Sequence, residues 1–250
     1  MKTIIQNKIK EIEAVYDIQV LYACESGSRA WGFASVDSDY DVRLIYKRKK
    51  ETYLSVVETQ DFLQLPIDEV LDFNAWDLKK VLKLVFQSNT TIFEWIQSPI
   101  VYRETAGFKK ELGLLCQQFY CQQTHTHHYL GLAKKKMEAM KENQVKYKTL
   151  FYILRALLSA KWNAQHGSIA PMEFKPLLEL VEDTVLKRDI LQLMKEKAAA
   201  TEQDYYTWEV TLKKYVSDLY VDLAQVQVQK KKGTFEVERL NEFFRKEVNL

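Results

Sequence analysis

The sequence has little glycine and proline, with seven and four of them in 250 residues. The glycines are also unevenly placed, because Gly27 and Gly32 stand close together and the next one is Gly107. Both residue types interrupt regular structure, so their scarcity predicts long helices over most of the chain. The early pair of glycines predicts a special turn instead.

Long apolar runs and charge of one sign are missing as well. No apolar stretch reaches the ~18 residues of a membrane-spanning helix, and the charged N-terminal segment lacks the apolar centre of a signal peptide. The 36 basic and 34 acidic residues nearly cancel, so a basic surface for nucleic acid must be local. Three cysteines, an odd number, fit reduced thiols, and we expect a cytoplasmic protein without membrane contact.

The first hundred residues predict a mixture of helices and strands from their hydrophobic periodicity. Asn74, with Asp77 three residues later, is typical of an N-cap and predicts that a helix begins there. The predicted elements in chain order are a helix over 4–16, a strand over 18–24, a strand over 41–46, one or two strands within 51–73, a helix over 78–86 and a short helix over 92–96.

From about residue 107 onward the periodicity is that of long amphipathic helices. The predicted helical segments are 107–142, 146–166, 173–196, 202–228 and 235–247. We therefore predict an α+β protein in which a small mixed β-sheet domain over 1–100 is followed by an α-helical domain over 101–250.

Three aspartates stand where strands are predicted to bring them together. Asp39 and Asp41 lie two residues apart at the head of a strand, so their side chains are expected on one face. Carboxylates so placed repel each other unless a cation lies between them, and oxygen ligands suit Mg²⁺ or Mn²⁺. Asp72, at the end of another predicted strand, is the best-placed third ligand for two metal ions.

The choice of Asp72 depends on the register of its strand. Asp68 and Glu69 precede it closely, so a shifted register would move the assignment to one of them. Asp77 follows, but the helix after it makes a capping role the better interpretation.

Two further patterns predict contacts with phosphate. A strand that leads into Gly27 and Ser28 directs backbone amides and a hydroxyl outward, and glycine permits close approach of a ligand. Lys148, Tyr152 and Arg155 stand at i, i+4 and i+7, hence on one face of a predicted helix. This polar set within an apolar run favours a face that meets a triphosphate or RNA, and the alternative is a solvated helix face.

Together these residues resemble a known signature. The run GSRAWGFASVDSDYDVR at 27–43 resembles the polymerase-beta superfamily pattern of Gly-Ser, a spacer and Asp-x-Asp on a strand. The blocks WDLKK, SN, EW, SPIVY, HHYLGLAKK and KYKTLFYILRALL are similar to predicted nucleotidyltransferases of the YcgL/RlaP type, over about residues 20–176. That family is regarded as associated with RNA ligases and RNA repair.

The resemblance implies transfer of a nucleoside monophosphate from an NTP such as ATP to an acceptor hydroxyl, with release of pyrophosphate. It implies that Asp39 and Asp41 hold two Mg²⁺ (or Mn²⁺) ions, and that Asp72 binds the catalytic ion and helps to deprotonate the acceptor. We expect the nucleotide in a cleft between the two domains and an RNA end as the acceptor. The residues implied to hold the β- and γ-phosphates are Gly27, Ser28 and Arg29.

Two alternatives are left open. The acceptor hydroxyl can belong to a protein or a small molecule, and a strong salt dependence of acceptor binding would favour a polymer. The chain can also be a non-catalytic RNA-binding or regulatory protein on a retired enzyme fold. The intact set of carboxylates argues against that second alternative, and a lack of Mg²⁺-dependent NTP binding would revive it.

Overall fold

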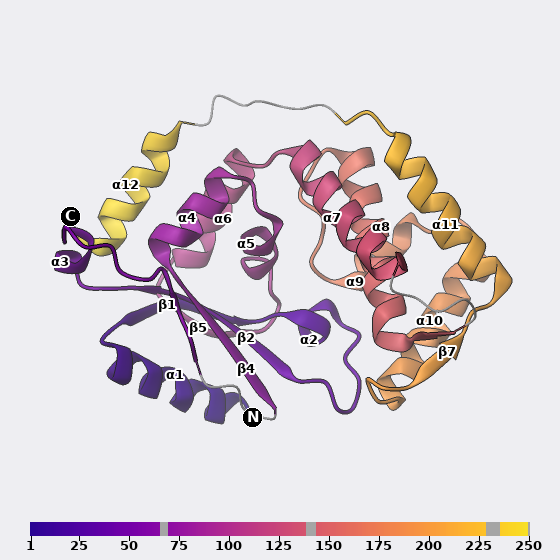
Figure 1. The fold of residues 1–250 in the computed structure, drawn as a ribbon, viewed down its shortest axis with the longest axis horizontal. Helices are drawn as coiled ribbons and strands as arrows, with labels where there is room; N and C mark the ends of the chain where they lie inside the picture. The colour runs from indigo at the N-terminus through magenta and orange to yellow at the C-terminus, as the bar shows by residue number, and fades with distance from the viewer. Residues whose placement is uncertain (66–69, 139–143, 229–235, 250) are drawn as a thin grey trace. The chain divides into compact units, whose positions relative to one another are not determined.

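The structure is a computed structural model that describes residues 1–65, 70–138, 144–228 and 236–249 (Figure 1). Their packing divides them into two compact units. The first unit comprises Met1–Gly27, Asp39–Phe119 and the C-terminal helix α12 (Val237–Val248). The second comprises Ser28–Ser38 and the chain from Tyr120 through helix α11 (Val210–Gln225). The predicted division into a catalytic domain over 1–100 and a helical domain over 101–250 concerns activity and stays a prediction.

The first unit is built on a five-stranded sheet of order β3-β4-β2-β1-β5. Strands β2 and β4 run parallel, and the other neighbouring pairs are antiparallel. The mixed sheet together with the many helices confirms the predicted α+β class. The strands are β1 (Gln19–Glu25), β2 (Tyr40–Lys47), β3 (Phe62–Leu63), β4 (Leu71–Asp77) and β5 (Val101–Glu104).

Helices cover both faces of this sheet (Figure 1). Helix α1 buries Ile5, Ile9 and Ile12 against strand residues such as Val42 and Leu44, as its helical spacing predicts. The helices on the opposite face of the sheet include α4, whose apolar stripe is buried. The helices of this unit are α1 (Lys2–Tyr16), α3 (Lys50–Tyr53), α4 (Leu78–Phe86), α5 (Thr90–Trp95), α6 (Phe108–Gln118) and α12.

Strand β4 is longer than the sequence pattern predicts. It pairs with β2 as far as Asp77, so Asn74 lies inside the sheet and the predicted N-cap at Asn74 is wrong. Asp77 caps α4 instead, because its Oδ1 accepts a hydrogen bond from the amide of Lys79 at 2.8 Å. The capping interpretation of Asp77 is therefore confirmed, and Asp72 lies at the start of its strand rather than at its end.

The second unit is mainly helical, and α8 is its central helix. Most of α8 is buried in the apolar core, which also takes in Phe33. The predicted segment 107–142 is broken between α6 and α7, and the segment 202–228 begins with a strand rather than a helix. Its elements are α7 (Gln122–Glu138), β6 (Gln144–Lys146), α8 (Tyr147–His166), α9 (Phe174–Leu177), the 3₁₀ helix η1 (Leu178–Leu180), α10 (Thr184–Ala199), β7 (Tyr205–Thr207) and α11.

Two predictions about the whole chain have partial answers. The helices of the described residues are each too short or too polar to span a lipid bilayer. The three cysteines, all within the described residues, are buried and form no disulfide there. The expected reduced state of the thiols stays a prediction.

Candidate active site

Two of the three predicted carboxylates stand side by side in the first unit. Asp41 and Asp72 are direct partners in the parallel ladder of β2 and β4. Because paired residues of neighbouring strands project to the same face, both carboxylates lie on one side of the sheet. The alternating burial along β4 fixes this register, since its apolar residues must face the core.

Arg43 lies between the two carboxylates. Its Nη2 donates to Asp41 Oδ1 at 2.5 Å and to Asp72 Oδ2 at 2.9 Å, and its Nη1 donates to the backbone oxygen of Asp72 at 3.0 Å. Arg43 stands two residues after Asp41 on the same strand, which places both side chains on one face. The guanidinium thus offsets the repulsion that the sequence predicts for neighbouring carboxylates.

Gly27 makes room for the Asp41 side chain. It has a φ of +61°, and a Cβ atom on it would stand 1.9 Å from Asp41 Oδ2. Any other residue there would displace the carboxylate and adopt a strained left-handed backbone. The glycine predicted for a phosphate turn is therefore also required by the aspartate beside it.

Glu25 fixes the backbone of Asp41 from the neighbouring strand. Its side chain is fully buried, and its Oε1 accepts a hydrogen bond from the Asp41 amide at 2.8 Å. Its Oε2 accepts from the hydroxyl of Tyr102 on β5. A buried carboxylate is stable only when hydrogen bonds satisfy it, and these contacts tie three strands together at Asp41.

The fit of this cluster to a divalent cation depends on the Asp41 and Asp72 pair. In the described part of the chain, no three His, Cys, Asp or Glu side chains are grouped to hold a metal ion. Asp39 is exposed and precedes β2, which begins at Tyr40. Asp41 and Asp72 still supply the carboxylate oxygens that Mg²⁺ and Mn²⁺ prefer, and they already accommodate the positive charge of Arg43.

The predicted phosphate residues Ser28 and Arg29 belong to the second unit. They lie in the short helix α2 (Gly27–Trp31), and both contact Ser38 at the end of the following loop. Ser28 Oγ donates to Ser38 Oγ at 3.2 Å, and Arg29 Nη2 donates to the backbone oxygen of Ser38 at 2.6 Å. The loop therefore returns to the helix from which it leaves.

Lys148 meets the same loop through the acidic residue Glu202. Its Nζ donates to Glu202 Oε2 at 2.5 Å, and the other carboxylate oxygen of Glu202 accepts from Ser38 Oγ at 3.4 Å. Lys148 and Ser28 thus belong to one polar cluster of the second unit, which the sequence spacing alone does not reveal.

Tyr152 and Arg155 pack against the aromatic side chains that follow Arg29. The ring of Tyr152 meets Trp31 edge-on at 4.9 Å, and Arg155 lies 4.3 Å above the Trp31 ring centroid. Arg155 is buried, and its Nε donates to the backbone oxygen of Met172 at 3.0 Å. The structure places these two residues within the helical unit, and their predicted contact with nucleotide stays a prediction.

Several residues of these clusters escape the sequence patterns. Arg43 could have been found from its two-residue spacing to Asp41, whereas Glu25 gives only the weak signal of an acid ending an apolar strand. Lys197 and Glu202 give none, because they lie more than 160 positions from the loop they contact. The alternative metal ligands Asp68 and Glu69 lie outside the described residues.

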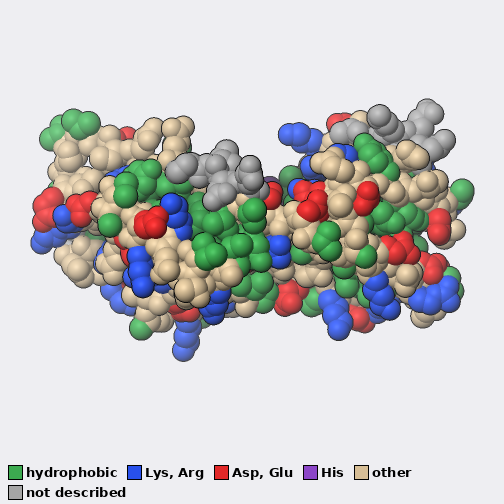
Figure 2. All heavy atoms as spheres, turned by 90° about the horizontal axis from the view of Figure 1, so that it is seen from below, with side chains coloured by type: hydrophobic (Ala, Val, Ile, Leu, Met, Phe, Trp, Pro, Cys, Tyr) green, Lys and Arg blue, Asp and Glu red, His purple; other side chains and the backbone are tan. Residues whose placement is uncertain are grey.

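Charged side chains are mixed over the face of the molecule in Figure 2. Lys and Arg are interspersed with Asp and Glu rather than gathered in one continuous field. This agrees with the nearly balanced composition, so attraction of a nucleic acid must come from a local group of side chains.

Comparison with known proteins gives a family, a relative and a solved structure that match this chain. The family model described as the RNA repair pathway DNA polymerase beta family matches residues 1–246. Protein YcgL of Bacillus subtilis (strain 168) is 40% identical over 206 residues, which cover 82% of this chain and 79% of that protein. The crystal structure of a nucleotidyltransferase-like protein from Exiguobacterium sibiricum 255-15 matches with a TM-score of 0.30 and 14% identity. That match covers 97% of this chain and 75% of the other.

Proposed function

The chain belongs to the RNA repair pathway DNA polymerase beta family, and we propose from this premise that it transfers a nucleoside monophosphate from an NTP to a hydroxyl at an RNA end. The type of enzyme, a polymerase-beta-type nucleotidyltransferase of RNA repair, follows from the family. The acceptor, the metal dependence and the residues that act are our proposal. We also expect an RNA ligase as a partner and a cytoplasmic location.

The observation that supports the proposal most directly is the register of β2 and β4. It aligns Asp41 with Asp72 on one face of the sheet. Asp41 also lies beside Gly27, where a Cβ atom would clash with its carboxylate. Carboxylates on adjacent strands are a general way to hold divalent cations for phosphoryl chemistry. Nucleotidyltransferases of this superfamily generally use such ions together with an NTP.

In the proposed reaction, the acceptor hydroxyl loses its proton and its oxygen bonds to the α-phosphorus of the NTP. The bond from that phosphorus to the bridging oxygen breaks, and pyrophosphate leaves. Asp72, nearly half exposed, is the proposed acceptor of the proton. Asp39, Asp41 and Asp72 would hold divalent cations, which when bound neutralise charge on the phosphates.

Arg43 takes a second role in this proposal. Its guanidinium holds the Asp41 and Asp72 side chains in place before an NTP arrives. Because oriented side chains need no rearrangement during the reaction, such preorganisation supports electrostatic stabilisation of the transferring group. Arg43 is therefore a positioning residue for the two carboxylates.

The second unit is proposed to supply the phosphate donors. Ser28 follows Gly27 directly in the chain, and Arg29 comes next, so these donors begin one peptide bond from the turn beside Asp41. Lys148 is the proposed cation for the leaving pyrophosphate, and it exchanges Glu202 for phosphate when the NTP binds. Tyr152 and Arg155 are proposed to contribute to nucleotide binding, and both also pack against Trp31 in the helix that carries Ser28.

Labelling tests the proposal. The full chain is incubated with each α-labelled NTP, Mg²⁺ and a pool of cell RNA and protein, and we expect label on RNA. The variant D41N is expected to lose Mg²⁺-dependent turnover while remaining folded, since it removes one ligand charge. The matched control is D218N, an exposed aspartate of α11 that pairs with Lys214, and it should keep full activity. Label on protein alone would refute the RNA acceptor. Turnover by D41N equal to that of the native chain would refute the catalytic assignment.

A further inference from the structure

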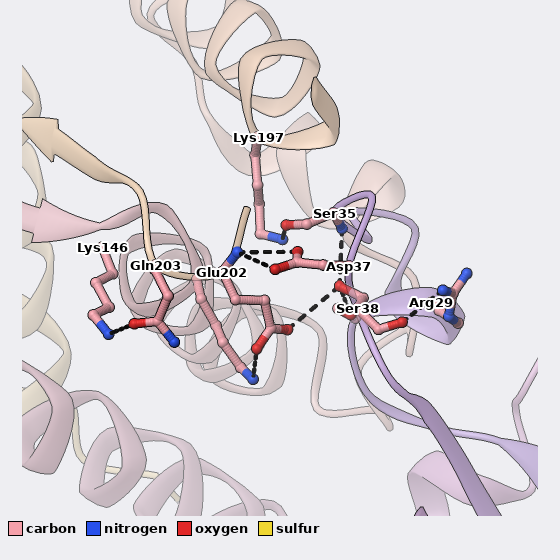
Figure 3. Close-up of polar contacts among 10 residues, drawn as sticks. Arg29, Ser35, Asp37, Ser38, Lys146, Lys197, Glu202 and Gln203 are labelled. Carbon is pink, nitrogen blue, oxygen red and sulfur yellow. Dashed lines mark hydrogen bonds and ion pairs between the residues drawn. The ribbon is translucent and has the colours of Figure 1, made fainter. Parts of the chain in front are cut away.

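A lysine is fully buried in the second unit, near the C-terminal end of α10. Lys197 has no exposed surface, and its Nζ donates to Ser35 Oγ at 2.8 Å (Figure 3). The ammonium also lies 5.5 Å from the ring centroid of Phe33. Burial of a charged amine next to a hydroxyl and a ring is costly, because neither replaces its hydration fully. Packing alone therefore does not account for an amine at this position.

Ser35 links Lys197 to two more serines, Ser38 and Ser28. The amide of Ser35 donates to Ser38 Oγ at 2.9 Å, and Ser28 Oγ donates to the same oxygen at 3.2 Å. A hydroxyl has two acceptor sites and one donor, and Ser38 uses all three, since it donates to Glu202. The orientation of the Ser38 hydroxyl is thus fully specified, and with it that of the buried Ser28 hydroxyl.

The chain just after Lys197 holds the same loop from a second point (Figure 3). The backbone amide of Glu202 donates to Asp37 Oδ1 at 3.0 Å and Oδ2 at 3.1 Å, while its side chain accepts from Ser38. Lys197 and Glu202 therefore hold three side chains of the loop over 35–38, those of Ser35, Asp37 and Ser38. In the chain, this loop lies between the proposed phosphate residue Ser28 and the first proposed metal ligand, Asp39.

We propose that Lys197 is a positioning residue for the nucleotidyl transfer: through Ser35 it fixes the loop over 35–38, and with this loop the position of Ser28, the proposed phosphate residue. This inference rests on the proposed function and adds a residue that lies far from every sequence motif. Lys197 does not touch the nucleotide in this scheme. Methionine, which is of similar length, would fill the same space without a charge. The amine therefore contributes orientation at the expense of stability.

The electrostatic surroundings agree with that trade. Burial is the main cause that lowers the pKa of Lys197 from 10.5 to about 8, and the positive charge of Lys148 adds to it. The carboxylates of Glu202 and Asp37 act in the opposite direction and help to keep the amine charged at neutral pH. A charged Lys197 is therefore present under ordinary assay conditions but at a cost to folding.

The test is the variant K197M in the full chain. Its KM is measured for each of ATP, GTP, CTP and UTP with Mg²⁺, and its melting temperature is measured in parallel. We expect the KM of the NTP that is turned over to rise about tenfold, while the melting temperature stays equal or rises. If Lys197 were purely structural, K197M would melt at a lower temperature than the native chain. An unchanged KM in K197M would overturn the inference, and so would a higher KM accompanied by a lower melting temperature. The matched control is K195M, an exposed lysine of the same helix, which should change neither quantity.

The variant S35A and the double variant S35A/K197M test the inference even if one substitution harms folding. S35A leaves the buried amine without its hydroxyl partner, so it should lower the melting temperature of the native chain but not that of K197M. Its effect on KM should equal that of K197M, and the double variant should add nothing further. Additive effects on KM would contradict the path through Ser35. If D41N turns over NTP as fast as the native chain, the proposed function itself has failed. If D41N loses turnover as expected but the KM of K197M equals that of the native chain, only this inference has failed.

Discussion

The two polar clusters solve the problem of charge in opposite ways. In the first unit, Asp41, Asp72 and Arg43 are partly exposed, and opposite charges lie in direct contact on neighbouring strands. In the second unit, Lys197 is fully buried and its direct partner is a neutral hydroxyl. The strand cluster is thus compensated by its own neighbours, whereas the loop cluster depends on contacts between distant parts of the chain. Because a buried charge is costly and an exposed ion pair is not, we expect the strand cluster to cost less stability than the loop cluster.

The largest expected effect comes from filling the space that the strand cluster requires. In G27A the new Cβ stands 1.9 Å from Asp41 Oδ2 at a φ of +61°, so the carboxylate must move. We expect NTP turnover to fall at least ~100-fold, with a loss of about 1–2 kcal/mol in the free energy of unfolding. Steady-state kinetics and urea denaturation measure the two. G113A, at a helical glycine with open space around its Cβ, is the control and should keep its activity. Full turnover by G27A would contradict the Asp41 assignment.

The pH dependence of stability tests the loop cluster. The folded state holds the pKa of Lys197 at about 8, below the 10.5 of an unfolded lysine. Between these values the unfolded chain binds more protons, so the contribution of Lys197 to the free energy of unfolding grows as pH rises. We expect a gain of about 3 kcal/mol from pH 7 to 11 relative to K197M, in which the group is missing. Chemical denaturation of both proteins across that range provides the measurement, and parallel curves would show that Lys197 is not a costly buried cation.

Removal of the arginine from the strand cluster tests its compensation. In R43M, Asp41 and Asp72 lose their ion pairs with the guanidinium. We expect a loss of about 1 kcal/mol in the free energy of unfolding, small because Asp72 is nearly half exposed. Mg²⁺ should restore much of this loss, so its addition should raise the melting temperature more in R43M than in the native chain. Calorimetric melting with and without Mg²⁺ decides this. R188M, an exposed arginine paired with Asp189, is the control, and an equal Mg²⁺ response in all three proteins would argue against a cation at Asp41 and Asp72.

The smallest expected effect on activity concerns Asp77, a carboxylate on the same strand as Asp72. It caps α4 and accepts a hydrogen bond from the hydroxyl of Tyr53 at 3.0 Å. We expect D77A to lose about 1–2 kcal/mol in the free energy of unfolding and to keep its NTP KM and kcat. A selective loss of kcat without destabilisation would make Asp77 a member of the strand cluster and would weaken the case for Asp72.

The sequence by itself determined the class of the fold and the strand half of the candidate site. Periodicity located α1, β1, β2, α4 and α5 to within a few residues, because each buries a face that its own sequence pattern marks. The spacing of Gly27, Asp41 and Asp72 pointed to the cluster that the parallel register assembles. The local pattern failed at Asn74, a good cap that became a strand residue, because pairing with β2 outweighs local propensity.

Only the tertiary structure decided what surrounds those residues. Arg43 as the counter-charge of Asp72 follows from the alignment of two strands, and Glu25 as a buried support of Asp41 follows from a third strand. The contacts of Lys197 and Glu202 with the loop over 35–38 join segments more than 160 residues apart. Local sequence carries no trace of such contacts, since burial of a lysine and saturation of a hydroxyl are set by whichever segments the fold brings together.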